Sequence, residues 1–109
     1  MRVLDLEGNP WDISEPDIYY FTSHRSTIYI HAKQGVFLFP ATLSDLLVAY
    51  QPLGFERLDR SNVVNLGNVD RYDADRKLVF FPGQDTFSTV SEANERRLKR
   101  YLRMHPPPP

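Results

Sequence analysis

Residues 57–65, RLDRSNVVN, place two arginines and a serine directly before an apolar run. Guanidinium groups stay charged and present several N–H donors in one plane, so they suit phosphates and the narrow minor groove of DNA. Arg60 is therefore the first candidate for a nucleic-acid contact, and a surface ion pair is the alternative. Arg57 alternates with Leu58 and should face away from the core, either toward a phosphate or toward solvent. Ser61 either donates to a phosphate or caps a local turn.

Two further polar stretches carry candidate contacts. SHRS, residues 23–26, separates two apolar strands, so Arg25 and Ser26 could reach a base edge or a phosphate with help from His24. An ordinary solvated loop is the alternative reading. The final helix, SEANERRLKRYLR, is rich in basic residues that either follow a phosphate backbone or compensate the helix dipole on a solvated face. The candidates nearest its start are Glu92, Asn94 and Arg96.

The residue types needed for catalysis or metal binding are sparse. The chain has no cysteine, and its three histidines, His24, His31 and His105, lack the i, i+4 spacing of a zinc-binding helix. Only five glycines are present and none cluster into a phosphate loop. We therefore expect no enzyme activity, no metal site and no cofactor.

Composition predicts one domain over residues 1–109, because 109 residues with 41% apolar content can build a single core. Residues 1–17 hold five acidic residues and one arginine, so the remainder carries an excess of basic residues although the whole chain has a net charge of -1. No apolar run has the length of a signal peptide or a membrane span, and we expect a cytoplasmic protein without membrane insertion.

Short apolar runs separated by turn signals predict a mainly antiparallel β architecture with two helices. A short internal helix is predicted over residues 42–51, where Thr42 can cap it, and a C-terminal helix begins at Ser91. Pro40 should end a strand, PGQD at residues 82–85 should form a turn, and residues 106–109 should be a proline tail. Strands are expected over residues 2–6, 18–22, 27–32, 36–39, 55–58, 62–66, 78–81 and 86–90.

Several residues are predicted to serve the fold rather than a ligand. Asn65 follows two valines and should bond to the local backbone. The predicted core includes Leu46, Val63, Val64, Leu66 and Phe80.

Four segments in order, IYYFTSHRSTIYIHAKQG, ATLSDLL, GFERLDRSNVVNLGNVDRY and TVSEANERRLKRYL, resemble the LytTR DNA-binding domain of bacterial transcription regulators. The family motif F-x-R-x-H-[RK]-S-x-x-V-N corresponds to residues 55–65, and the resemblance covers about residues 18–102. It implies about ten short strands in three small antiparallel sheets. It also implies that loops, rather than a recognition helix, enter successive grooves of double-stranded DNA.

Carried over residue by residue, the resemblance places Arg25 and Ser26 in one major groove, Arg60 over the minor groove, and Ser91 with Glu92 in the next major groove. The family usually places two copies on paired sites, so a homodimer on DNA is expected. Residues 1–17 are too few for a receiver domain, so we expect a stand-alone domain regulated by its expression level, by dimerisation or by a protein partner.

Two positions depart from the family pattern: Asp59 replaces a frequent histidine, and Glu92 replaces a frequent arginine. Each carboxylate would weaken phosphate attraction unless it pairs with an arginine or accepts from a cytosine amino group. The main prediction is a sequence-specific DNA-binding transcription regulator. The alternative is a protein-interaction or regulatory module on the same fold with weak or no DNA binding.

Overall fold

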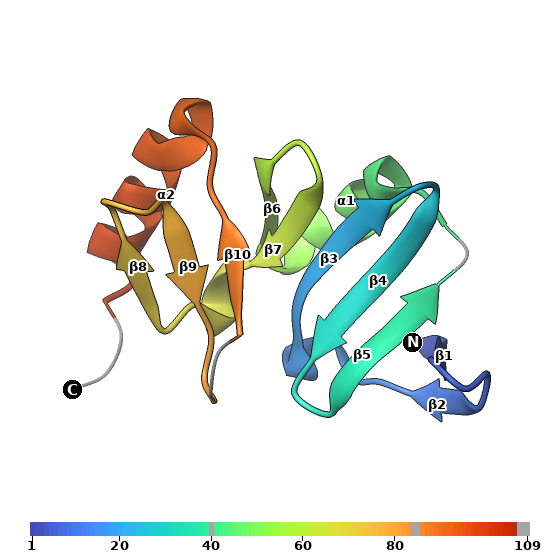
Figure 1. The fold of residues 1–109 in the computed structure, drawn as a ribbon. Helices are drawn as coiled ribbons and strands as arrows, with labels where there is room; N and C mark the ends of the chain where they lie inside the picture. Colours follow the sequence, from blue (N-terminus) through green and yellow to red (C-terminus); the bar gives the residue numbers. More distant parts are fainter. Residues whose placement is uncertain (40, 84–85, 107–109) are drawn as a thin grey trace.

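The computed structural model describes residues 1–39, 41–83 and 86–106, and these form ten strands and two α-helices (Figure 1). The predicted mainly antiparallel β class is therefore confirmed. Short 3-10 helices occupy Glu15–Asp17, Gln51–Leu53 and Leu66–Asn68. The other elements are β1 (Arg2–Asp5), β2 (Pro10–Asp12), β3 (Ile18–His24), β4 (Thr27–Ala32), β5 (Gly35–Phe39), α1 (Leu43–Tyr50), β6 (Phe55–Asp59), β7 (Asn62–Asn65), β8 (Arg71–Asp73), β9 (Leu78–Phe80), β10 (Phe87–Thr89) and α2 (Glu92–Met104).

The strands pair into a seven-stranded sheet, ordered β2-β1-β5-β4-β3-β7-β6, and a three-stranded sheet, ordered β10-β9-β8. The expectation of three sheets is wrong for the described residues. Strand β3 pairs antiparallel with β4 on one side and with β7 on the other, and this double pairing joins the first strands and the central strands into one sheet.

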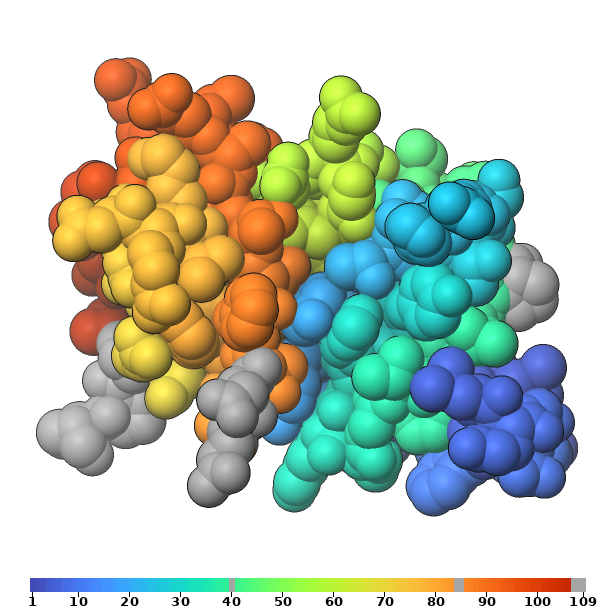
Figure 2. Space-filling view, in the orientation of Figure 1, coloured from blue at the N-terminus to red at the C-terminus, as the bar shows by residue number. Residues whose placement is uncertain are grey.

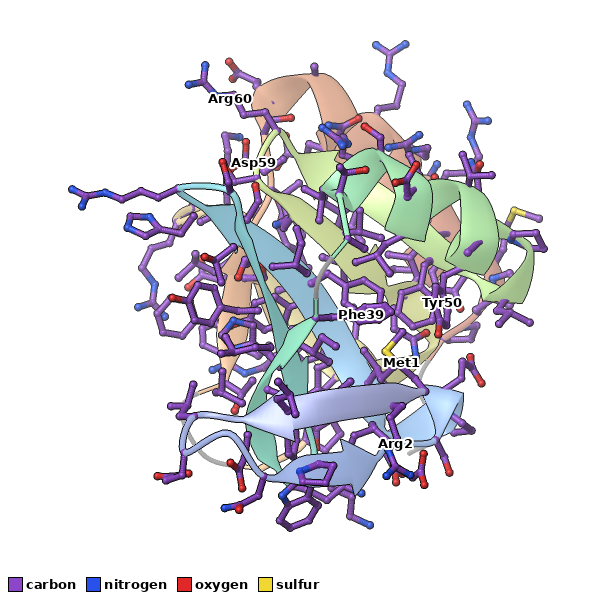
Figure 3. The ribbon with its side chains drawn as sticks, turned by 90° about the vertical axis from the view of Figure 1, so that its right-hand side faces the viewer. Met1, Arg2, Phe39, Tyr50, Asp59 and Arg60 are labelled. Carbon is purple, nitrogen blue, oxygen red and sulfur yellow. The ribbon has the colours of Figure 1, made fainter. Side chains whose placement is uncertain are left out.

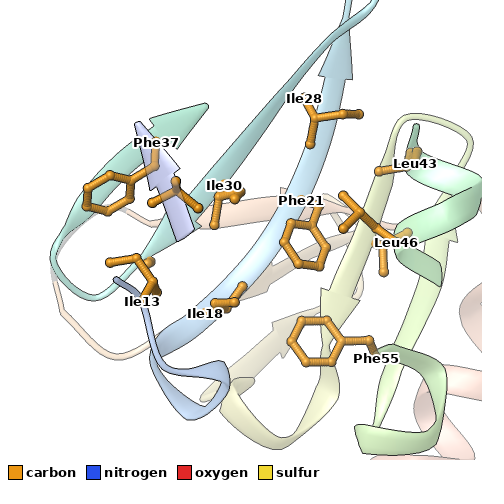
Figure 4. Packing of buried hydrophobic residues seen from close by; sticks show 12 residues of the cluster. Ile13, Ile18, Phe21, Ile28, Ile30, Phe37, Leu43, Leu46 and Phe55 are labelled. Atoms are coloured by element: carbon orange, nitrogen blue, oxygen red, sulfur yellow. The ribbon is translucent and has the colours of Figure 1, made fainter. Parts of the chain in front are cut away.

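Strands β3 and β7 contribute to two hydrophobic cores at once. Successive side chains of a strand point to opposite faces. Phe21 and its partner Val63 pack into the core beneath α1, which Figure 4 shows from close by. Tyr20 and its partner Val64 face the other way, into the core formed with the three-stranded sheet and α2. A shift of this pair by one residue would exchange the two sets, so burial on both faces fixes the register.

Both helices follow their predicted patterns. Thr42 lies at the N-cap of α1, and its hydroxyl accepts from the backbone N–H of Asp45 at 3.1 Å. Leu43 and Leu46 bury the apolar face of α1, and Leu98 is the buried residue of α2. The helices therefore cover opposite faces of the β3–β7 pair (Figure 1).

Three sequence expectations need correction. Strands β2 and β8 were not predicted: β2 pairs with β1 after the turn at Gly8, and β8 pairs with β9. SHRS is not a four-residue loop, because β3 and β4 stay paired as far as His24 and Thr27 and leave a two-residue turn. Phe80 is only partly buried: the Arg71 guanidinium carbon lies 3.8 Å from the centre of its ring.

The small sheet buries the neighbours of Phe80 instead, Val79 and Phe81. Successive side chains along a strand point to opposite faces, so Val79 and Phe81 share the face toward α2 and Phe80 lies on the other face. Asn65 is structural as predicted, although its amide nitrogen donates to a distant carbonyl, that of Ile18, at 3.0 Å. The predicted strand end at Pro40, part of the turn at residues 82–85 and most of the proline tail lie outside the described residues.

Asn62 joins the two sheets through its side chain. Strands β6 and β7 lose register between Glu56 and Asp59, a β-bulge that takes backbone N–H groups out of the ladder. The side-chain oxygen of Asn62 accepts from the N–H of Leu58 at 3.2 Å and of Asp59 at 2.8 Å. Its side-chain nitrogen donates to the Ser88 hydroxyl and the Thr89 carbonyl, both at 2.8 Å. Asn62 is 1% exposed, so these bonds form away from water.

We expect Asn62→Ala to lower the free energy of unfolding by about 2–4 kcal/mol, because it leaves buried donors and acceptors without partners. Urea unfolding followed by circular dichroism measures the change. The matched control is Ser61→Ala in the same turn, whose exposed side chain should contribute less than about 0.5 kcal/mol. Equal stability of the two variants would contradict the role given to Asn62.

Strand β4 carries a half-buried histidine, His31, beside Tyr20 of the core formed with the three-stranded sheet and α2. The His31 ring stacks on Tyr20 with ring centres 4.1 Å apart, and its Nε2 lies 3.1 Å from the Thr22 hydroxyl. Burial lowers the pKa of His31 from 6.5 to about 4. The native state therefore holds His31 neutral at a pH where the unfolded chain is already protonated.

Because the folded pKa is the lower one, His31 contributes stability above about pH 6.5 and loses it as the pH falls toward 4. We expect the chain to lose up to about 3 kcal/mol more between pH 7.5 and pH 4 than His31→Gln does. Urea unfolding at several pH values gives both curves. His24→Gln, a change at an exposed site, should leave the pH dependence intact; parallel curves for the chain and His31→Gln would refute the prediction.

Candidate nucleic-acid interface

Three exposed segments meet along one edge of the molecule, which we name the loop edge: the turn at residues 25–26, the turn at residues 60–61, and residues 92–96 at the start of α2 (Figure 1). Hydrogen bonds tie them together. The N–H of Ser23 donates to the Ser61 carbonyl at 3.1 Å, and the N–H of Ser91 donates to the Leu58 carbonyl at 2.8 Å. The segments therefore have fixed relative positions although they are distant in sequence.

The turn between β3 and β4 is strained. Arg25 has φ 50° and Ser26 has φ 67°, so both residues occupy the left-handed region. Two-residue hairpin turns of this kind favour Asn-Gly, because side chains with a Cβ pay roughly 1 kcal/mol or more each in that region. Both side chains are exposed, as is that of His24 before them. An unfavourable turn that still presents an arginine and a serine indicates a use for those side chains.

The turn between β6 and β7 is held by side chains of β6 and β10. Asp59 accepts from the N–H of Arg60 at 2.8 Å through one carboxylate oxygen and from the Thr89 hydroxyl at 2.6 Å through the other. The Arg57 guanidinium donates to the Arg60 carbonyl at 3.2 Å. Figure 3 shows Asp59 and Arg60 at the top of the molecule, far from Arg2 on the β1–β2 hairpin.

The start of α2 is docked onto the end of β6 through Asn94. Its side-chain nitrogen donates to the Leu58 carbonyl at 3.2 Å and to the Ser91 hydroxyl at 2.8 Å. Its oxygen accepts from Arg97 at 3.0 Å, and Arg97 also lies 3.4 Å from the carboxylate of Glu56. Asn94 therefore orients the helix start with all of its polar atoms.

The loop edge keeps a surplus of positive charge. None of the ion pairs formed by residues 1–39, 41–83 and 86–106 includes Arg25, Arg57, Arg60 or Arg96. The carboxylates nearby are engaged elsewhere: Glu56 pairs with Arg97, and Asp59 accepts two hydrogen bonds. A basic edge of this kind attracts phosphates even though the net charge of the chain is -1.

All nine residues singled out from the sequence lie on or beside the loop edge. The exposed ones are His24, Arg25, Ser26, Arg60, Ser61, Glu92 and Arg96, while Arg57 and Asn94 are half-buried. In the space-filling view of Figure 2 the yellow-green turn around residue 60 projects from this edge. Glu92 is partly neutralised, since its carboxylate lies 4.0 Å from the Lys77 ammonium.

Sequence reasoning missed the residues that hold the edge together. Asn62 and Thr89 attracted no attention because a polar residue at a strand end is common. Arg97 could not be told apart from the other basic residues of the C-terminal helix. Its contacts with the Arg57 carbonyl and the Glu56 carboxylate of β6 form only because α2 packs against that strand. The one sequence signal for Asn62 is that a polar residue begins the run Asn-Val-Val at residues 62–64.

Other kinds of site find little support in the structure. Among the residues described, no three His, Asp or Glu side chains come together as metal ligands. Neither helix of the described chain is long and apolar enough to cross a membrane.

Comparison with known proteins identifies a family and a similar solved structure. The family model for the LytTr DNA-binding domain matches residues 12–103. A solved structure, the LytTr DNA-binding domain of a protein described as a methyl-accepting/DNA response regulator from Bacillus cereus, superposes with a TM-score of 0.78. That match covers 94% of each chain at 16% sequence identity, so it demonstrates a shared fold. No curated protein matches the sequence.

The family model spans most of the chain, and the loop edge contains the three segments that the resemblance singled out. The chain therefore belongs to the LytTR family of DNA-binding domains.

Proposed function

We propose that the chain is a sequence-specific DNA-binding transcription regulator that reads DNA with the loop edge. The observation that supports this most strongly is the meeting of three exposed segments on one edge, each with an arginine free of carboxylate partners in the described chain. Family membership favours DNA as the partner and binding rather than catalysis as the activity.

In this proposal Arg25 and Ser26 enter one major groove, where a guanidinium can donate two bonds to guanine. Arg60, in the middle of the edge, lies over the minor groove, whose negative potential favours arginine. Glu92 and Arg96 reach the next major groove, and a glutamate there can accept from a cytosine amino group. The largest dimension of the molecule is 38 Å, enough to span one turn of B-DNA, about 34–36 Å.

The alternative is a regulatory module with little DNA affinity, and Asp59 was one of the residues that favoured it. Asp59 departs from the family pattern, but its carboxylate stabilises the turn through the Arg60 N–H and the Thr89 hydroxyl. It therefore aims Arg60 outward. Pairing of two copies on neighbouring sites remains a prediction from the family resemblance. Control by a protein partner and a cytoplasmic location remain predictions from the sequence.

The proposal predicts that Arg25→Ala and Arg60→Ala each weaken binding to a duplex selected from a random pool by roughly 10–100-fold, because each removes a base or groove contact worth about 1–3 kcal/mol. Fluorescence anisotropy at two or more salt concentrations measures the affinities. Lys33→Ala, which removes an exposed charge from the β4–β5 turn away from the edge, is the matched control. Absence of duplex binding by the unaltered chain at low salt would refute the proposal.

A second variant separates loss of contact from loss of folding. Replacing Arg25-Ser26 by Asn-Gly suits the left-handed turn, so it should raise stability by about 1 kcal/mol while it weakens DNA binding. A more stable protein that binds less tightly identifies the two side chains as contacts. Unchanged affinity would show that this turn lies outside the DNA interface.

A further inference from the structure

A cavity of about 370 Å³ opens behind the two turns of the loop edge, where they face the start of α1. Arg57 and Arg60 line one side, and the hydroxyls of Ser26 and Ser44 line others. Ser44 belongs to α1, an element that the resemblance did not assign to DNA. The cavity therefore combines residues from β3, β4, β6 and α1 next to the proposed interface.

The charged residues that line this cavity are both arginines. Glu56, the acidic neighbour of Arg57, forms its ion pair with Arg97 at 3.4 Å. Asp59, the neighbour of Arg60, directs its carboxylate to the Arg60 N–H and to Thr89. No carboxylate lines the cavity as the structure describes it, so an anion in it would meet two guanidinium groups.

Hydrogen-bond donors remain available at the cavity wall. An arginine side chain has five N–H donors, and the bond of Arg57 to the Arg60 carbonyl uses one of them. The Thr42 hydroxyl accepts from the N–H of Asp45, so its own proton is free to donate. Ser26 and Ser44 are exposed, and their hydroxyls make no hydrogen bond to any other described residue.

Part of the lining is apolar. Ile28 and Leu43 are buried, and Ala41 lies half-buried beside them. A free phosphate ion would gain nothing from these side chains. A phosphodiester carries a deoxyribose next to each phosphate, and the C–H groups of the sugar can pack against such a surface.

We propose that this cavity binds one phosphate of the DNA backbone with its adjoining deoxyribose. Arg57 and Ser44 hold the phosphate, Arg60 adds positive charge beside it, and the apolar lining at Ala41 contacts the sugar. The site rests on the proposed function and adds α1 to the interface. Because backbone phosphates carry no sequence information, it fixes the position of the domain on DNA and contributes equally to all sequences.

Methylphosphonate substitution provides the test. Each phosphate near the binding site of a selected duplex is replaced in turn by a neutral methylphosphonate, and affinity is measured for the chain and for Arg57→Gln. At one position the substitution should weaken binding of the unaltered chain about tenfold and binding of Arg57→Gln less than about twofold, because the contact is already lost. Arg57→Gln should also weaken selected and random duplexes alike and reduce the salt slope by about 1.

A second pair of variants guards against misfolding of Arg57→Gln. Ser44→Glu places a carboxylate on the cavity wall and should weaken all duplexes about tenfold or more, whereas Ala49→Glu adds the same charge near the other end of α1 and should have little effect. Equal affinity of these two variants, or identical methylphosphonate profiles for the chain and Arg57→Gln, would overturn the phosphate site and leave the proposed function standing. Failure of the unaltered chain to bind any duplex would overturn both.

Discussion

The side chain of Asn62 is the interaction on which the rest of the structure depends. Two sheets meet where β7 approaches β10, and they need a bond between them there. At the same place a bulge in β6 leaves the N–H groups of Leu58 and Asp59 without partners in the strand ladder. One buried amide satisfies both requirements, because it accepts twice from β6 and donates twice to β10. Buried polar groups are costly unless they are fully bonded, so this site allows only one arrangement of the two sheets.

The loop edge follows from that arrangement. With β10 held against the β6–β7 turn, Thr89 can bond Asp59 and α2 can begin beside Leu58. Carboxylates that would otherwise attract the arginines are used within the fold, which leaves positive charge on the surface. The domain thus presents a basic edge from a weakly acidic chain, and it does so with short turns whose geometry is set by the sheets behind them.

The sequence carried enough information for the elements and for the exposed residues of the site. Aromatic and β-branched runs predicted β3 and β7, alternation predicted β4, and the spacing of Leu43 and Leu46 predicted α1, because these signals are local. The number of sheets could not be predicted, since it depends on both edges of β3 being paired. Phe80 was misplaced because a continuous run of four apolar residues does not indicate which alternate residues face inward.

The roles of polar residues were harder to predict than their positions. Asp59 looked like a departure that would repel phosphate, and only its contacts with Arg60 and Thr89 gave it a structural role. Asn94 resembled a DNA contact, yet its amide bonds within the protein. Both cases depend on partners more than 25 residues away in the sequence, |i−j| = 30 for Asp59 with Thr89 and |i−j| = 36 for Asn94 with Leu58.

The central claim is that DNA contacts the loop edge, and amide chemical shifts of the ¹⁵N-labelled chain test it most directly. During titration with a selected duplex, the largest shift changes should occur at residues 25–26, 60–61 and 92–96. The β1–β2 hairpin at the other end of the molecule should remain unchanged (Figure 3). Changes centred on that hairpin, with the two turns and the start of α2 unaffected, would contradict the account.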